Sequence, residues 1–452
     1  MTTLELACVP GSPSMLFSMA VILRGHIFHT PHNPFEEDEE GALEVIGGAL
    51  ALLDGRVGAL GSLAEVQAQY PDAPVLGDGQ DYILPGFVDT HVHYPQVSVV
   101  GTMGVTLLQW LETRTLPEEA RLSDTTYARG VAETFLRGLA RNGTTTALVF
   151  GAHQPAAQAA FFEAASSSGL RLTSGLVWGD RLLRPELEAD PETCYGESEK
   201  LIAAWHNHGR LRYAVTPRFA LSCSEAVLAA AGALAQRYPD VLIQTHLNES
   251  PAEIAQVAEL FPWAKDYLET YERFGLVTER SVFAHNVHVL DGELERLGAA
   301  RSCVAHCPSS NMFIGSGLFD MKRHLAHGVR SALGSDVGGG TGFSLFKEGL
   351  MSYQGQMLHP DGFPLGPAHL LYLATRAGAL ALGLGEVGDL SPGQQADFML
   401  VRPPEGSTLA DVLAQSPSAE ASLGALFTLA REESVREVFV AGEPLFTRLG
   451  LA

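Results

Sequence analysis

Two histidines separated by one residue form the most informative group in this sequence. His91 and His93 end an apolar segment, residues 83–93, whose composition predicts a buried β-strand. Side chains two positions apart on a strand lie on the same face, so both imidazoles can reach one metal ion. A second pair, His206 and His208, follows a predicted helix, and residues two apart on a helix do not face each other. We therefore interpret this second pair as surface histidines.

Other candidate metal ligands follow later predicted strands. The proposed set consists of three imidazoles and one carboxylate: His91, His93, His246 and Asp336. Such a set suits Zn²⁺, one ion per chain, with an open position for a catalytic water. Fe²⁺ accepts the same ligands, so the sequence predicts the presence of a metal more firmly than its identity.

Glu249 lies three residues after His246 and directly before a predicted helix that begins at Pro251. The sequence Ser250-Pro-Ala-Glu253 is typical of a helix N-terminus closed by a capping box. A carboxylate at this position can take a proton from an activated water and pass it to a substrate. The alternative interpretation is that Glu249 only complements the helix dipole.

The elements that must position these residues alternate between strands and helices. The sequence predicts eight strands, which together indicate a (β/α)8 barrel of the TIM type: 83–93, 144–150, 171–180, 212–222, 241–247, 281–289, 302–308 and 330–335. Working residues of such barrels lie at the C-terminal ends of strands. His91, His93, His246, His285 and Asp336 all fall at or near such positions.

The two chain ends differ from the middle, because each contains short strand patterns separated by turns such as Asp54-Gly55 and Ala441-Gly442. We expect an N-terminal tail at 1–18, a small composite β domain formed by 19–82 together with 389–452, and the barrel at 83–388. Gly338 to Gly340 lack a following Gly-Lys-Ser/Thr and are interpreted as a tight turn, not a phosphate loop.

Composition and charge restrict the classes of partner. The 452 residues carry a formal charge of −23, which disfavours nucleic acid and anionic membranes. Apolar runs are too short to span a bilayer, and the apolar start at 15–23 has no basic segment before it. The five cysteines contain no CxxC pair, which favours reduced thiols. We expect a cytoplasmic protein whose partner is an uncharged small molecule.

Several motifs resemble those of the amidohydrolase superfamily, and more closely its guanine deaminase branch. They occur in the family's order across nearly the whole predicted barrel: Pro85-Gly-Phe-Val-Asp-Thr-His-Val-His-Tyr-Pro-Gln96, Thr216-Pro-Arg-Phe-Ala220, His246-Leu-Asn-Glu249, Ala284-His285, His306-Cys-Pro-Ser-Ser-Asn311 and Gly334-Ser-Asp-Val-Gly-Gly-Gly340. The HxH and Ser-Asp elements mark the superfamily, whereas Gln96 and the Pro-Arg-Phe segment narrow the resemblance to guanine deaminase.

The resemblance implies hydrolytic deamination of guanine to xanthine and ammonia in purine catabolism, by a homodimer. It implies the metal ligands named above and catalytic roles for Glu249, Asp336 and His285. Purine-binding residues are implied as well: Gln96, Arg218 and Phe219, with His93, His246, Glu249, His285 and Asp336 also contacting the substrate. Arg218 can donate to the six-position oxygen, Phe219 can stack on the ring, and the Gln96 amide can both donate and accept. Arg218 could instead form a structural ion pair at the barrel rim.

Two departures from the family pattern affect the expected pocket wall. Leu116 stands where the family usually has an aromatic residue, and Asn286 replaces a glycine that often follows the histidine of the sixth strand. Because these positions could change substrate preference, a related deaminase or chlorohydrolase acting on a triazine, a pterin or cytosine is the main alternative. A barrel that has lost catalysis and serves as a scaffold is a second alternative.

Overall fold

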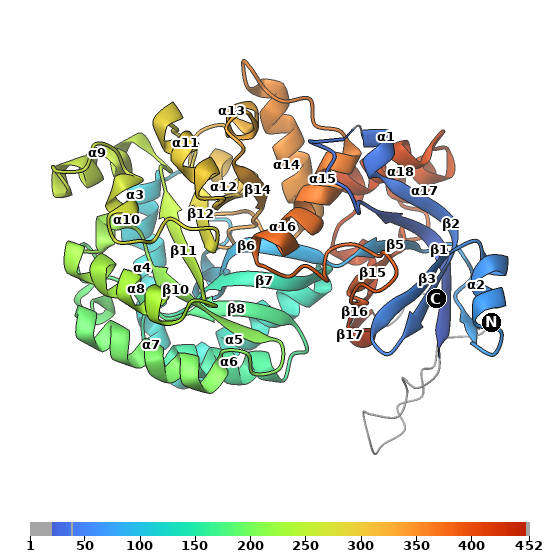
Figure 1. The fold of residues 1–452 in the computed structure, drawn as a ribbon, viewed down its shortest axis with the longest axis horizontal. Coiled ribbons are helices and arrows are strands. Elements are labelled where there is room, and N and C mark those ends of the chain that lie inside the picture. The colour runs from blue at the N-terminus through green and yellow to red at the C-terminus, as the bar shows by residue number, and fades with distance from the viewer. Residues whose placement is uncertain (1–19, 38, 449–452) are drawn as a thin grey trace.

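The computed structural model describes residues 20–37 and 39–448, which form two adjoining lobes (Figure 1). The larger lobe is a barrel of parallel strands surrounded by helices, and the smaller contains a separate sheet. Strands from the beginning and the end of the chain lie side by side in that smaller sheet. The expected barrel with a composite β unit built from both chain ends is therefore confirmed. The predicted tail at 1–18 lies outside the described residues.

The barrel strands follow one another around the sheet in chain order, with β9 paired to β10 off the main path. Their bounds are β6 Phe87–His93, β7 Thr144–Phe150, β8 Arg171–Gly175, β9 Val177–Trp178, β10 Leu211–Pro217, β11 Leu242–Leu247, β12 Ser281–His285, β13 Cys303–His306 and β14 Arg330–Leu333. Hydrogen bonds join the last strand to the first, because Asp336 N donates to His91 O at 2.8 Å and Thr90 Oγ1 donates to Leu333 O at 2.8 Å. These contacts bring the two ends of the predicted site together.

The first predicted strand, residues 83–93, proves to be two strands. Tyr82–Pro85 is β5 of the small sheet, and Gly86 separates it from β6 of the barrel. Gly86 N donates to Asp397 O in the small sheet, and the next residue, Phe87, donates to Gly143 O in the barrel. A Cβ atom at Gly86 would lie 2.3 Å from the Thr145 side chain, so only glycine fits where the chain changes sheets.

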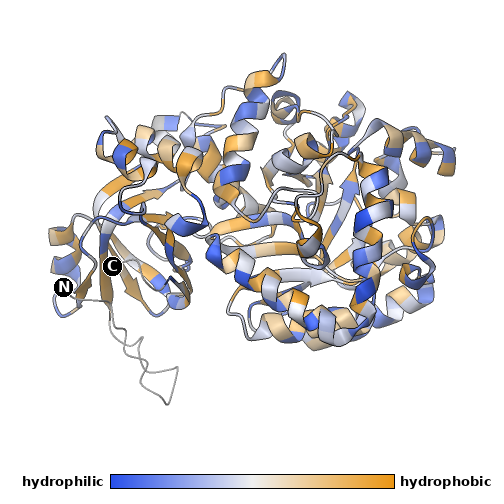
Figure 2. Cartoon of the chain, turned by 180° about the vertical axis from the view of Figure 1, so that it is seen from behind, coloured by the Kyte–Doolittle hydropathy of each residue, from blue (hydrophilic) through white to orange (hydrophobic). Residues whose placement is uncertain are grey.

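Helices cover the outside of the barrel and follow most of its strands. The principal ones are α5 Thr125–Arg141, α6 Pro155–Ser166, α7 Pro191–Trp205, α8 Glu225–Arg237, α9 Pro251–Leu260, α10 Glu269–Glu272, α11 Asp291–Ala299, α12 Pro308–Phe313, α13 Met321–Ala326, α14 Leu345–Leu358, α15 Pro367–Ala374 and α16 Arg376–Ala381. Figure 2 shows hydrophobic residues concentrated in the strands and on the inward sides of these helices. Burial of both strand faces is expected for a parallel barrel and supplies most of its hydrophobic stabilisation.

The small sheet joins antiparallel hairpins from both chain ends. It contains β1 Val21–His29, β2 Glu44–Leu53, β3 Arg56–Gly61, β4 Val75–Leu76, β5 Tyr82–Pro85, β15 Phe398–Val401, β16 Val435–Val440 and β17 Glu443–Thr447. Helices α1 Glu39–Ala42, α2 Leu63–Gln69, α17 Thr408–Ala414 and α18 Ala419–Leu429 accompany it. The predicted turns at Asp54-Gly55 and Ala441-Gly442 have positive φ at both positions, as a two-residue hairpin turn requires.

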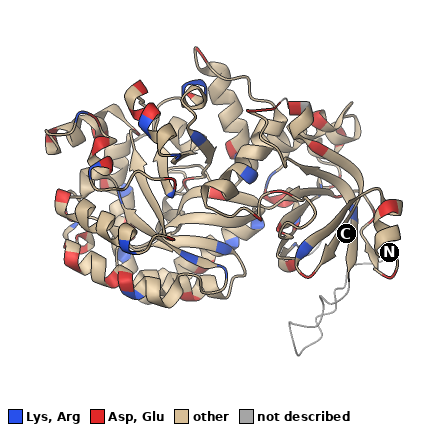
Figure 3. Cartoon of the chain, in the orientation of Figure 1, with Lys and Arg blue, Asp and Glu red and all other residues tan. Residues whose placement is uncertain are grey.

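The distribution of charge agrees with the acidic composition. Figure 3 shows acidic residues spread over many of the outer helices, with basic residues scattered among them. Among the described residues, none of the helices has both the length and the apolar character required to cross a bilayer.

Candidate active site

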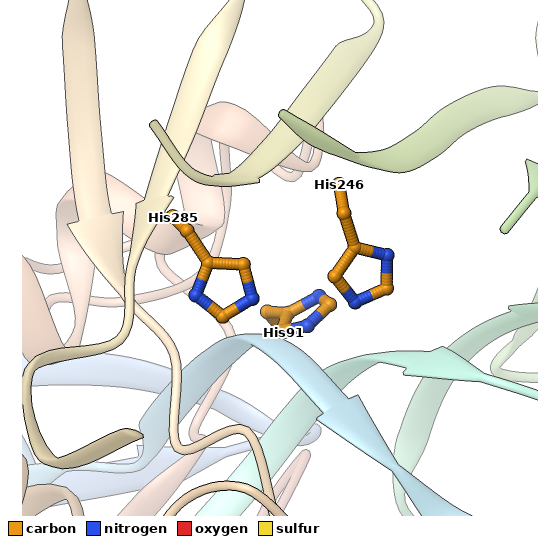
Figure 4. Close-up of side chains that lie close together, drawn as sticks. All are labelled: His91, His246 and His285. Carbon is orange, nitrogen blue, oxygen red and sulfur yellow. The ribbon is translucent and has the colours of Figure 1, made fainter. Parts of the chain in front are cut away.

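Three histidines from three strands converge at the C-terminal end of the barrel. Figure 4 shows the rings of His91, His246 and His285 directed toward a common point. Their ligand nitrogens lie within 4.8 Å of one another, and all three side chains are buried. His91 lies two residues before the end of β6, His246 is the penultimate residue of β11, and His285 is the last residue of β12. The barrel therefore assembles residues that are almost 200 positions apart.

The HxH pair and the carboxylate after the last strand form a second, overlapping cluster. The Nε2 atoms of His91 and His93 are 3.2 Å apart, and each lies 3.3 Å from Asp336 Oδ1. Burial by itself would raise the pKa of Asp336, but its contacts with the two histidines hold that pKa well below the usual value. Burial lowers the pKa of His91 to about 3. A carboxylate beside imidazole nitrogens is a donor set that a divalent cation such as Zn²⁺ binds.

Hydrogen bonds to the surrounding protein fix how these rings present their nitrogens. His246 Nδ1 lies 2.6 Å from Arg218 O, and because a carbonyl can only accept, this nitrogen carries the hydrogen. His246 Nε2 is then left as a lone-pair donor toward the cluster. Beneath His91, Asp89 Oδ1 accepts from the backbone N–H groups of His91 and Ser335 at 3.2 and 3.0 Å. These contacts fix the orientation of the His246 ring and join the backbone of His91 to that of Ser335 through Asp89.

Glu249 lies beside this cluster, as predicted, and is 4 % exposed. Burial, the neighbouring carboxylate of Glu253 and the charge of Asp336 raise its pKa well above the usual value. Its Oε2 is 3.5 Å from His285 Nε2, and its Oε1 accepts from Ser316 Oγ at 3.3 Å. The capping box expected at the start of α9 is present. Because Glu253 occupies the helix N-terminus, the carboxylate of Glu249 is available for other contacts.

His285 Nδ1 lies 2.9 Å from Asn311 Oδ1, so the opposite ring nitrogen faces Glu249. This arrangement holds the imidazole between the candidate acid–base group and helix α12. His285 therefore contacts the predicted acid–base residue Glu249. Its ring is also part of the cluster formed with His91 and His246.

A cavity opens onto these groups. It is lined by His93, Gln96, Leu107, Trp110, Leu111, Arg218, Phe219, His246, Glu249, His285, Ile314 and Asp336. An apolar wall with a few polar groups is typical of small-molecule sites. All predicted substrate-binding residues therefore line one cavity. Apolar residues from α3 Leu107–Trp110 and the π-helix Leu111–Thr115 form part of its wall.

Two functional candidates behind this cavity wall were missed by sequence reasoning. Glu119, in α4 Leu116–Ala120, accepts from Gln96 Nε2 at 2.8 Å and from Arg218 Nη1 at 2.6 Å. His153 Nε2 lies 3.2 Å from that Arg218 nitrogen and 3.4 Å from Glu119 Oε2. Arg218 thus does form an ion pair, but with a buried carboxylate inside the site. The position of His153 shortly after β7 was the signal that could have identified it.

Other sequence interpretations have separate outcomes. His208 is exposed, whereas His206 is only partly exposed. The Nε2 atom of His206 lies 2.9 Å from Asp240 Oδ2, at the opposite end of the barrel strands.

Leu116 is buried close to the cavity wall without lining the cavity itself. Asn286 has a φ of 45° and donates from Nδ2 to His324 Nε2 at 2.9 Å, behind the site. Neither departure from the family pattern removes a polar group from the cavity.

Comparisons with known proteins agree with this geometry. Residues 82–445 match the Amidohydrolase family. A relative named a probable guanine deaminase, from Deinococcus radiodurans, is 55 % identical over 94 % of this chain and 99 % of its own length. The solved guanine deaminase of E. coli superposes with a TM-score of 0.90 at 37 % identity, covering 95 % of this chain and 99 % of that one.

A guanine deaminase from C. acetobutylicum, solved with guanine bound in its active site, superposes with a TM-score of 0.87 at 25 % identity, covering 94 % of this chain and 100 % of that one. The agreement thus extends over the barrel and the small sheet together. The chain belongs to the amidohydrolase family, and within that family it groups with the guanine deaminases.

Proposed function

We propose that this protein hydrolyses guanine to xanthine and ammonia with the help of one bound divalent metal ion. The observation that carries the proposal is a single cavity that combines a histidine–aspartate cluster, a buried carboxylate and hydrogen-bonding groups suited to a purine edge. The 55 % identity to a probable guanine deaminase supports the choice of substrate.

The residues present fit a metal ion. Those that would hold it are His91, His93, His246 and Asp336. Two observations support this assignment. The ligand atoms lie close together, and the hydrogen bond from His246 Nδ1 to the Arg218 carbonyl leaves His246 Nε2 available to bind the ion. When bound, such an ion acts as a Lewis acid and makes water a competent nucleophile near neutral pH. We propose Zn²⁺, with Fe²⁺ as the alternative that the same ligands accept.

Glu249 would manage the protons of the reaction. Its carboxylate accepts a proton from the attacking water as the new C–O bond forms at the amine-bearing carbon, position two of guanine. Because burial and the neighbouring carboxylates raise its pKa well above the usual value, Glu249 can hold this proton and donate it to the adjacent ring nitrogen. Glu249 then takes the remaining water-derived proton from the new hydroxyl group and passes it to the amine, so the C–N bond breaks, the hydroxyl becomes a carbonyl, and guanine and water become xanthine and ammonia. His285, 3.5 Å away, would hold this carboxylate in place.

Three side chains would hold the purine. The Arg218 guanidinium supplies donors to the six-position oxygen, and Gln96 pairs with the neighbouring ring edge. Phe219, only 6 % exposed, offers a flat face against which the ring can pack. Its ring centroid lies 6.1 Å from that of His246, so a purine stacked there is adjacent to the candidate metal ligands.

Metal analysis combined with product identification tests this function. Purified protein should contain about one equivalent of Zn²⁺ or Fe²⁺ and should release equimolar xanthine and ammonia from guanine. A parallel panel of cytosine, a pterin and an aminated triazine tests the related-deaminase alternative. Absence of xanthine from metal-loaded, folded protein would refute the proposal, and absence of both metal and activity would favour the scaffold alternative.

We also propose a cytoplasmic homodimer. The four cysteines within the described residues are unpaired and buried, which agrees with a reducing compartment. Exposed apolar side chains of α14, at Tyr353, Met357 and Leu358, offer a surface that a second copy could cover. Sedimentation measurements that give the mass of one chain would exclude the dimer.

A further inference from the structure

Glu119 joins the two polar residues proposed to contact the purine. Its carboxylate is 3 % exposed and divides its oxygens between them: Oε1 accepts from Gln96 Nε2 at 2.8 Å, and Oε2 accepts from Arg218 Nη1 at 2.6 Å. Glu119 does not itself line the cavity. It stands behind the wall and contacts two residues that come from different strand ends of the barrel.

The contact with Glu119 decides which way the Gln96 amide points. An ionised carboxylate can only accept hydrogen bonds, so the nitrogen of the amide must face it and the oxygen must face elsewhere. Gln96 Oε1 is buried and makes no hydrogen bond among the described residues. This unpartnered acceptor belongs to a residue that lines the cavity, where a ligand donor can satisfy it.

The surroundings of Glu119 keep its carboxylate ionised. Burial alone would raise the pKa of this carboxyl, but the positive charge of Arg218 and the contact with His153 lower it well below the usual value. The backbone is held as well, because Glu119 O accepts from Gln154 Nε2 at 3.4 Å. Arg218 donates to Glu119 from Nη1. The other N–H groups of its planar guanidinium remain as hydrogen-bond donors.

We propose that Glu119 is a positioning residue that sets the donor–acceptor pattern read by the site. This inference rests on the proposed purine function of the cavity. With Glu119 ionised, Gln96 presents an acceptor and Arg218 presents donors. The complementary ligand is a purine with an oxygen at position six and a hydrogen on the adjacent ring nitrogen. A six-amino purine presents the reverse pattern, with a donor facing Arg218 and a lone pair facing Gln96 Oε1, and is rejected.

Binding of two non-reactive purines tests this proposal. Hypoxanthine carries the matching pattern and adenine the reverse, and neither has the two-position amine that deamination removes. Calorimetric titration of the metal-loaded protein should show hypoxanthine binding at least ~100-fold more tightly than adenine, because two hydrogen bonds are gained in one complex and opposed in the other. In Glu119→Gln the preference should fall below ~10-fold, since Gln96 is then free to turn its amide.

Glu118→Gln is a matched control. Glu118 is the neighbouring residue of the same helix and is also buried, but its carboxylate contacts Arg121 at 2.7 Å and Tyr127, neither of which lines the cavity. Its substitution should leave the hypoxanthine preference unchanged. If the role of Glu119 is merely structural, Glu119→Gln should lose thermal stability but keep the preference for hypoxanthine.

Glu119→Asp provides a second test of the same contact. If Glu119→Gln does not fold, Glu119→Asp retains the charge but withdraws the carboxylate by one methylene, and the preference should fall about tenfold or more. An unchanged preference in a folded Glu119 variant overturns the proposal. Failure of the wild type to make xanthine, together with an intact preference for hypoxanthine, would instead refute only the proposed reaction.

Discussion

A buried histidine behind the site should make the stability of this protein depend on pH in a defined window. The His324 ring is fully buried and stacks on Phe319 at 4.1 Å between centroids. Its Nδ1 donates to Asp320 O at 2.7 Å, and its Nε2 accepts from Asn286 Nδ2 at 2.9 Å. These two hydrogen bonds require a neutral ring that carries its hydrogen on Nδ1. A proton added to Nε2 would face the N–H donor of the Asn286 amide and break that hydrogen bond.

The magnitude follows from the displaced pKa. Burial, together with the positive charges of Arg323 and His327, lowers the pKa of His324 from 6.5 to about 4, against the favourable pull of Asp320. Because the unfolded chain binds the proton more readily, stability is complete above pH ~6.5 and is lost as the pH falls toward ~4. One such group costs about 2 kcal/mol between pH 7 and pH 5, and about 3 kcal/mol in full, at roughly 1.4 kcal/mol per pKa unit.

Urea unfolding of wild type and His324→Gln at pH 7 and pH 5 measures this contribution. Release of metal from the site also depends on pH, but it occurs in both proteins and cancels in the difference. We expect wild type to lose about 2 kcal/mol more than the variant over this interval. Substitution of the exposed His208 by Gln should leave the wild-type pH dependence intact. Equal losses in wild type and His324→Gln would refute the reasoning that a buried neutral imidazole causes the effect.

Three further predictions concern the site directly. Glu249→Gln should lower kcat about 10³-fold while the metal content stays the same, and near-normal turnover would remove Glu249 from the mechanism. Gly338→Ala should weaken purine binding and stability, because its Cβ would lie 2.2 Å from Gln96 Oε1; Gly342→Ala, at a similar positive φ with nothing within 4 Å, is the control. Dialysis against a chelator should abolish turnover and lower the Tm, and added Zn²⁺ should restore both. A metal that binds only the folded protein stabilises it, so an unchanged Tm would contradict such binding.

The sequence was most informative where a short-range rule applied. The period of two along a strand placed His91 and His93 on one face, and their Nε2 atoms do lie 3.2 Å apart. The barrel placed His246 and Asp336 at the same end, because parallel strands share the direction in which they finish. The capping box before α9 similarly located Glu249 in a loop at that end.

What sequence reasoning missed depends on contacts between distant segments. Glu119 follows a π-helix, and no local pattern indicates that its carboxylate reaches Arg218, 99 residues away. The division of the first predicted strand at Gly86 has the same origin, because the backbone partners on its two sides, Asp397 and Gly143, belong to distant segments. An apolar run of strand-forming residues gives no sign that its two halves belong to different sheets.

Arg218 connects the two halves of the site through different atoms. Its backbone carbonyl accepts from His246 Nδ1 and so orients a candidate metal ligand, whereas its guanidinium pairs with Glu119 on the purine side. Because the carbonyl belongs to the main chain, evolution can vary the side chain at this position without disturbing the histidine. Residues that recognise the ligand can therefore change while the metal cluster is retained. This separation gives a physical reason why one barrel can serve hydrolysis of different aminated rings.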